Sequence, residues 1–197
     1  MSGLAIAEWI AGVVGGLAAI FQFAIWTGQW LDSRLYGFSA VERHGVTLLD
    51  KIRQSSFKPD FVLGIGRSGA FLGGWLAGNL GSWPIEAIER FHSDDAMHPI
   101  DYPGGEGKIA YLKSVFGEDA KVLIVEGATT TGNTLRQCAI LIQTCAPKWD
   151  CRYCVLYEVE VNKFPVNYVG RRLKKPPFRY PWHKTSAWKM FIRSGDA

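Results

Sequence analysis

The stretch Glu126 to Thr134, EGATTTGNT, combines one acid with glycine and hydroxyl side chains. Its threonines supply hydroxyl donors, and Gly132 permits a tight turn and a close approach of the backbone to a ligand. Phosphate suits these donors better than a carboxylate, because it has more acceptor oxygens. The predicted phosphate-binding residues are Thr129, Thr130, Thr131, Gly132, Asn133 and Thr134.

The flanking sequence predicts the elements that position this loop. Val122 to Val125 is an uninterrupted β-branched and aliphatic run, which is typical of a strand buried in a parallel sheet. From Thr134 onward, apolar residues recur at helical spacing. A helix that begins at the loop would direct unpaired backbone amides at an anion. The alternative is an ordinary turn whose threonines cap the helix.

A second loop of the same design lies upstream. Phe61 to Ile65 has the pattern of a buried strand, a tight turn follows at residues 66–69, and a helix of small residues is expected from Ala70 to Leu80. The guanidinium group of Arg67, within this turn, suits phosphate oxygens. Two such loops in one chain favour an anionic ligand more strongly than either loop alone.

The segment VLIVEGATTTGNTL resembles the phosphoribosyl pyrophosphate (PRPP) motif of type I phosphoribosyltransferases, and GIGRSG is similar to their pyrophosphate loop. The resemblance implies that the first loop binds the 5′-phosphate of PRPP. It implies catalytic roles for Glu126 and Arg67, with Glu126 ordering the ribose hydroxyls or helping to hold Mg²⁺. The implied pyrophosphate-binding residues are Gly66, Arg67, Ser68 and Gly69.

Two positions depart from this motif. Gly127 stands where the family usually has a second acid, and Thr130 stands where purine-salvage members often carry an aspartate. The missing acid at Gly127 affects how such a site would bind ribose and Mg²⁺. It leaves a second function open, a catalytically inactive sensor or effector that binds PRPP or a nucleotide.

The sequence after Arg152 resembles the base-recognition end of xanthine/guanine-type purine phosphoribosyltransferases, through PVNYVG at residues 165–170 and Pro181-Trp182. The resemblance implies a small C-terminal hood at about residues 155–185. It also implies an aromatic side chain that stacks on the nucleobase, Phe178 or Tyr180. Glu158 or Glu160 stands where relatives place a lysine, so the base would meet an acceptor instead of a donor.

Three further segments flank the two loops. Ser39 and Glu42 have capping-box spacing ahead of an amphipathic helix whose apolar residues are Val46, Leu48, Leu49 and Ile52. Pro84 to Ile88 is expected to be a strand. The polar, glycine-containing stretch Phe91 to Gly107 is long for a connection, which predicts a lid or a disordered insert.

The N-terminal stretch Trp9 to Trp26 contains no charged side chain and is about long enough to span a bilayer. No basic region precedes it and no cleavage pattern follows, which disfavours a signal peptide. A helix buried in an oligomer is the alternative. The basic residues that follow, beginning with Arg34, predict a single-pass membrane protein with its catalytic domain in the cytoplasm. Gly12 and Gly16 have the spacing of a dimerising pair, so a homo-oligomer is expected.

The formal net charge is +4, and from Lys163 onward a single acid, Asp196, accompanies many basic residues. Nucleic acid is a possible partner of this region, but anionic lipids or phosphorylated ligands are favoured. The four cysteines include one C-x-x-C pair, Cys151 and Cys154, without a second metal-binding pair nearby. We expect them to be buried thiols.

Together these patterns predict an α/β fold, a mainly parallel sheet flanked by helices. Residues 1–35 are expected to form the membrane-spanning helix and juxtamembrane segment, and residues 36–197 a phosphoribosyltransferase-like domain. The predicted activity is transfer of phosphoribose from PRPP to a nucleobase with release of pyrophosphate, with Mg²⁺ bound to PRPP. An oligomeric effector that permeabilises membranes is a third possibility.

Overall fold

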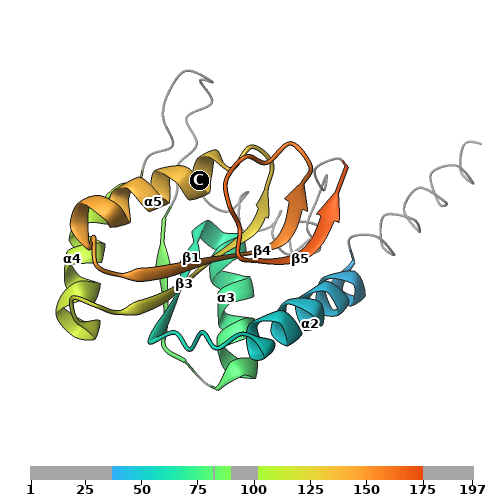
Figure 1. Cartoon of the computed structure of the whole chain (residues 1–197), viewed down its shortest axis with the longest axis horizontal. Helices are drawn as coiled ribbons and strands as arrows, with labels where there is room; N and C mark the ends of the chain where they lie inside the picture. The colour runs from blue at the N-terminus through green and yellow to red at the C-terminus, as the bar shows by residue number, and fades with distance from the viewer. Residues whose placement is uncertain (1–36, 82, 90–101, 175–197) are drawn as a thin grey trace, which may run out of the picture. The chain divides into compact units, whose positions relative to one another are not determined.

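The structure is a computed structural model that describes residues 37–81, 83–89 and 102–174 (Figure 1). The N-terminal span, the stacking candidates Phe178 and Tyr180, and most of the long connection that begins at Phe91 lie outside these residues. Among the helices that the structure describes, none has the length and apolar character needed to cross a membrane.

Five strands of the described residues form one sheet, in the spatial order β2-β1-β3-β4-β5, and every neighbouring pair is parallel. The central strands β1 and β3 are buried along most of their length, which explains their uninterrupted apolar runs. This confirms the predicted α/β fold with a parallel sheet. The strands are β1 (Phe61–Ile65), β2 (Ile85–Ile88), β3 (Lys121–Thr129), β4 (Asp150–Val159) and β5 (Tyr168–Leu173).

In the described part of the chain, four helices cover the two faces of this sheet (Figure 1). They are α2 (Phe38–Gln54), α3 (Gly66–Leu80), α4 (Gly105–Phe116) and α5 (Asn133–Cys145). Residues such as Ile109 of α4 and Leu135 of α5 pack with the sheet in the main apolar core. On the other face, Gly45 of α2 lies so close to Trp75 of α3 that a Cβ there would be 2.8 Å from the indole ring.

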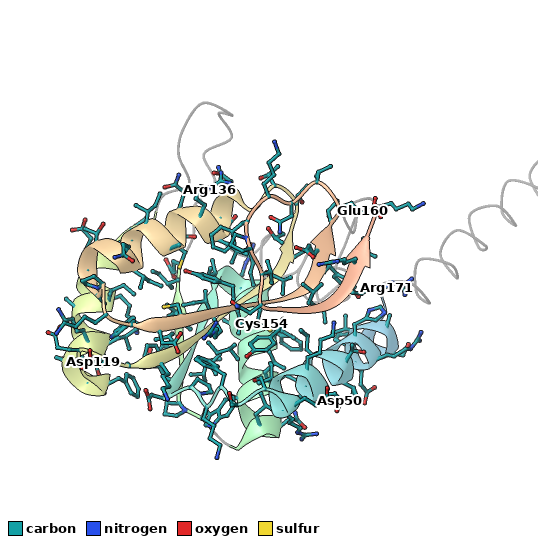
Figure 2. The ribbon with its side chains drawn as sticks, viewed as in Figure 1. Asp50, Asp119, Arg136, Cys154, Glu160 and Arg171 are labelled. Atoms are coloured by element: carbon teal, nitrogen blue, oxygen red, sulfur yellow. The ribbon has the colours of Figure 1, made fainter. Side chains whose placement is uncertain are left out.

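The described cysteines are free thiols, and two of them lie deep in the fold. Cys138 and Cys154 are fully buried. Asp50, Asp119 and Glu160, in contrast to Cys154, are exposed (Figure 2). Burial raises the pKa of Cys154, and burial followed by the charge of Asp150 raises the pKa of Cys151 to about 12. These thiols therefore stay protonated near neutral pH.

The long connection that was predicted to reach Gly107 ends earlier, because α4 begins at Gly105. Gly104 forms the N-cap of α4 with a left-handed φ of 68°, which favours glycine. A Cβ on Gly105 would lie only 2.8 Å from Cδ2 of Leu141 in α5. The prediction was wrong here because these glycines start a helix and let it pack closely, although glycine is more common in loops.

The predicted N-cap of α2 is also displaced. The helix begins at Phe38, so Ser39 lies in its first turn instead of ahead of it. Leu48 and Ile52 are buried as expected, while Val46 remains 45% exposed. The apolar stripe of α2 is therefore narrower than the sequence pattern indicated.

Candidate functional site

The two predicted anion-binding loops lie at neighbouring strand ends. β1 and β3 pair directly, with Gly64 opposite Val125. Since these strands are parallel, the helices that follow them, α3 and α5, begin at the same edge of the sheet (Figure 1). The first of these helices touches β3, because a Cβ on Gly69 would collide with the carbonyl oxygen of Val125. The fold thus brings the two loops together.

The predicted pyrophosphate loop is the first turn of α3. The helix starts immediately after β1, at Gly66, whose φ of 58° is left-handed. Ser68 is partly exposed, and the side chain of Arg67 is exposed at this turn. Ile65, the N-cap residue, makes no side-chain capping hydrogen bond. The first backbone amides of α3 have no partner within the helix. The role of these residues in binding pyrophosphate stays a prediction.

The second loop is shorter than the sequence indicated. β3 continues through Gly127 to Thr129, because it pairs with β4 as far as Thr129 opposite Glu158. Thr129 is buried, whereas Thr130 and Thr131 are exposed. We call residues 129–134 the phosphate loop, in keeping with the predicted set.

The phosphate loop reaches α5 through Gly132, which forms the N-cap with φ 80° and ψ 5°. The backbone amide of Asn133 donates a 3.4 Å hydrogen bond to Oγ1 of Thr131. The carbonyl of Thr134 accepts a hydrogen bond of 2.8 Å from the hydroxyl of Tyr102, which lies three residues before the start of α4. No sequence pattern pointed to Tyr102, because this contact joins residues 32 positions apart.

Glu126 lies on β3 and is 3% exposed. Burial, followed by electrostatic repulsion from Cys151 and Glu126, raises the pKa of Cys138 on α5. Within the described ranges, no cluster of three or more His, Cys, Asp or Glu side chains could hold a metal ion. Mg²⁺ usually binds through one or two carboxylates together with substrate phosphates. One carboxylate at Glu126 therefore fits an ion that PRPP itself carries.

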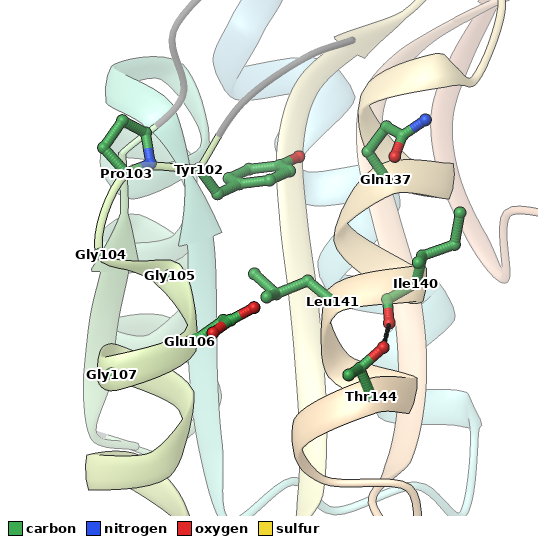
Figure 3. Close-up of a pocket in the computed structure, with 10 residues that line it drawn as sticks. All are labelled: Tyr102, Pro103, Gly104, Gly105, Glu106, Gly107, Gln137, Ile140, Leu141 and Thr144. Atoms are coloured by element: carbon green, nitrogen blue, oxygen red, sulfur yellow. Dashed lines mark hydrogen bonds between the residues drawn. The ribbon is translucent and has the colours of Figure 1, made fainter.

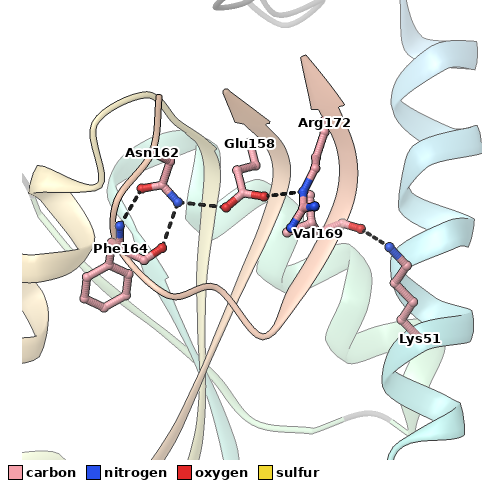
Figure 4. A network of polar contacts seen from close by, with 6 residues as sticks. All are labelled: Lys51, Glu158, Asn162, Phe164, Val169 and Arg172. Atoms are coloured by element: carbon pink, nitrogen blue, oxygen red, sulfur yellow. Dashed lines mark hydrogen bonds and ion pairs between the residues drawn. The ribbon is translucent and has the colours of Figure 1, made fainter. Parts of the chain in front are cut away.

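Glu158, the predicted acceptor for a base, already has two partners (Figure 4). Its carboxylate accepts hydrogen bonds of 2.8 Å from Nδ2 of Asn162 and from Nε of Arg172. The residue is 8% exposed at the end of β4. Within the segment predicted to form the hood, β5 is a strand of the main sheet. A contact of Glu158 with a base stays a prediction, and such a contact would compete with these bonds.

A cavity of about 570 Å³ lies between α4 and α5 and not at the two loops (Figure 3). None of the predicted site residues lines it. The candidate site is therefore assigned from the strand ends and helix N-termini. The cavity is lined by Tyr102, Pro103, Gly104, Gly105, Glu106, Gly107, Gln137, Ile140, Leu141 and Thr144.

A buried polar chain links α2 to the last two strands. Nδ1 of His44 lies 3.2 Å from the hydroxyl of Tyr157, and Nη1 of Arg171 lies 3.2 Å from Nε2 of His44. Because a guanidinium group only donates, Nε2 must accept and Nδ1 must carry the hydrogen. Burial, followed by the charges of Arg171 and Arg43, lowers the pKa of His44. The imidazole is therefore neutral, with one defined tautomer.

We expect the substitution His44→Gln to flatten the pH dependence of stability below about pH 6.5. The folded pKa of His44 lies below that of an unfolded chain. The contribution of His44 to the free energy of unfolding is therefore complete above the pKa of the unfolded chain. It is lost as the pH falls towards the pKa of the folded protein, because the unfolded chain binds the proton first. Urea titrations of the wild type and of His44→Gln between about pH 8 and pH 5 measure how the free energy of unfolding depends on pH. An equally steep fall in the variant would contradict it.

No family model matches the chain. Over 98 residues it is 32% identical to the adenine phosphoribosyltransferase of Nostoc punctiforme. This match covers 49% of the chain and 57% of that protein, so the chain spans less than two thirds of the relative's length.

Three solved structures share the fold. A hypothetical protein from Neisseria gonorrhoeae with bound ppGpp has a TM-score of 0.62 at 20% identity, covering 79% of this chain and 91% of its own. The xanthine-guanine-hypoxanthine phosphoribosyltransferase of Helicobacter pylori has a TM-score of 0.58 at 14% identity, over 80% and 97%. The purine phosphoribosyltransferase of Pyrococcus horikoshii has a TM-score of 0.56 at 22% identity, over 74% and 89%. The chain therefore shares its α/β fold with these solved structures, two of which are phosphoribosyltransferases.

Proposed function

We propose that this chain binds PRPP and transfers its phosphoribose to a nucleobase, with release of pyrophosphate. The observation that supports this most directly is the contact between Gly69 and Val125, which joins the first turn of α3 to the strand that leads into the phosphate loop. Two helix N-termini then face one edge of the sheet. A ligand with phosphate groups at both ends of a pentose suits that arrangement.

In this proposal, each loop binds one end of the ligand. The exposed guanidinium of Arg67 and the first amides of α3 hold the pyrophosphate, and the phosphate loop holds the 5′-phosphate. Glu126 orders the ribose hydroxyls, and a Mg²⁺ ion that accompanies PRPP would supply positive charge for the leaving group. Catalysis would then rest on positioning and on electrostatic stabilisation of an oxocarbenium-like transition state.

Calorimetry of the full chain with Mg²⁺ and PRPP tests binding, and a pyrophosphate assay with each nucleobase tests transfer. We expect Arg67→Ala to weaken PRPP binding by about tenfold or more, because a hydrogen bond to a charged group contributes about 1.5–3 kcal/mol. Arg152→Ala is a matched control, since Arg152 pairs with Asp150 at the amino end of β4. A wild-type chain that gives no binding of PRPP would refute the proposal.

A binding protein without transferase activity is the second candidate. Gly127 lacks the usual second carboxylate, and Glu158 is engaged by Asn162 and Arg172. The similar fold from Neisseria gonorrhoeae was solved with ppGpp, a nucleotide that, like PRPP, carries phosphate groups at two positions of a pentose. Binding of PRPP or ppGpp without release of pyrophosphate from PRPP and any base would favour this candidate.

A further inference from the structure

The loop between β4 and β5 rests on the phosphate loop. A Cβ on Gly132 would collide with Oδ1 of Asn162 and with Cβ of Phe164, and it would lie 3.0 Å from the backbone nitrogen of Phe164. Gly132 is buried, although it lies between exposed residues of the loop. The residues that follow β4 therefore restrict the conformation of the phosphate loop at Gly132.

Asn162 holds its own loop through three side-chain hydrogen bonds (Figure 4). Its Nδ2 atom donates to Oε1 of Glu158 and to the carbonyl of Phe164, each at 2.8 Å. Its Oδ1 atom accepts from the backbone amide of Phe164 at 3.0 Å. Since both ends of the amide are used, the side chain has one defined orientation, with Oδ1 on the side of Gly132.

Glu158 fixes this orientation from the other side. One of its carboxylate oxygens accepts from Asn162, and the other accepts from Nε of Arg172 on the edge strand β5. Glu158 also stands opposite Thr129, the first residue of the phosphate loop, in the pairing of β3 with β4. A continuous set of contacts thus runs from β5 through Glu158 and Asn162 to Gly132.

We propose that Asn162 is a positioning residue for the phosphate loop, oriented by Glu158 and Arg172. Asn162 touches Gly132, the N-cap of α5, and Gly132 sets the direction of the amides that follow it. Without the Asn162 side chain, Gly132 can move, and the backbone amides that follow it no longer point in one direction. The phosphate-binding consequence rests on the proposed function, whereas the effect on the loop itself does not.

The substitution Asn162→Asp is the sharpest test. It replaces a donor by a carboxylate oxygen next to the carboxylate of Glu158 and the carbonyl of Phe164, so attraction becomes repulsion. Hydrogen exchange of the backbone amides of residues 130–135, in the full chain without ligand, is expected to accelerate about tenfold or more. Asn162→Ala removes the side chain without adding charge and is expected to have a smaller effect of the same sign.

Two further variants separate positioning from general stability. Asn167→Ala is the matched control, because Asn167 lies in the same connection and its side chain also accepts a backbone hydrogen bond, from Tyr153, at 2.8 Å. It is expected to leave exchange in the phosphate loop unchanged. The double variant combines Asn162→Asp with Glu158→Gln. The amide introduced at position 158 can donate to the carboxylate introduced at position 162, so exchange should return part of the way to wild type.

The binding readout is the affinity for ribose 5-phosphate and for PRPP, measured by calorimetry. Asn162→Asp is expected to weaken both by about tenfold, while Asn167→Ala leaves them unchanged. If exchange in the phosphate loop changes no more in Asn162→Asp than in Asn167→Ala, the inference is overturned, whatever the chain binds. If exchange responds but wild type binds neither ligand, the inference stands and the proposed function fails.

Discussion

The substitution Gly69→Ala is expected to lower the free energy of unfolding by about 3 kcal/mol or more. Its Cβ would collide with the carbonyl oxygen of Val125, an atom fixed in the centre of the sheet. Helix α3 would have to move away from β3, and the contact between the two candidate anion sites would open. Urea denaturation of the full chain measures the loss.

Gly78→Ala provides a control in the same helix. Gly78 is exposed, and a Cβ there meets no atom within 4 Å. Alanine has a higher helix propensity than glycine, so this variant should gain about 0.5–1 kcal/mol. Equal stability of Gly69→Ala and wild type would show that α3 does not pack against β3 as closely as described.

The second large effect is expected for Gly132→Ala, which should lower PRPP affinity by about tenfold or more and stability by about 3 kcal/mol. Alanine is strained at a φ of 80°, and its methyl group would collide with Asn162 and Phe164. The phosphate loop can relieve the collision only by moving. Calorimetry with PRPP and urea denaturation give the two quantities.

Gly104→Ala separates strain from collision. Gly104 is the N-cap of α4 with nearly the same backbone conformation, φ 68° and ψ 8°, but a Cβ there meets no atom within 4 Å. This variant should lose only about 1 kcal/mol. If Gly104→Ala and Gly132→Ala lower the free energy of unfolding by the same amount, the contact of Gly132 with the β4–β5 connection does not contribute to stability. That result would also argue against the role of Asn162.

The sheet and its two loops were predictable because they depend on local sequence. β1 and β3 are buried on both faces by helices, so their apolar runs are uninterrupted and easily recognised. Arg67 lies in the first turn of α3, and the threonines lie from the end of β3 to the start of α5. Parallel pairing of the two strands then requires that these loops share one edge of the sheet.

The start of α4 was missed because its local signals conflict. The glycines at 104, 105 and 107 favour a loop, while the close approach of Gly105 to Leu141 needs a residue without a side chain. That need arises only once α4 lies against α5. Gly170 of β5 must also lack a side chain, because a Cβ there would lie 2.7 Å from the carbonyl oxygen of Leu156.

The sequence by itself determined the fold class and the two residue sets suited to phosphate, because buried strands and polar loops have characteristic local patterns. Only the tertiary structure decided the partners of the polar side chains. His44 meets Tyr157 and Arg171, which are 113 and 127 positions away. Glu158, which the sequence presented as a free acceptor, is held by Asn162 and Arg172. Such pairs form because folding buries His44, Tyr157 and Glu158, and a buried polar group needs a partner wherever in the chain that partner lies.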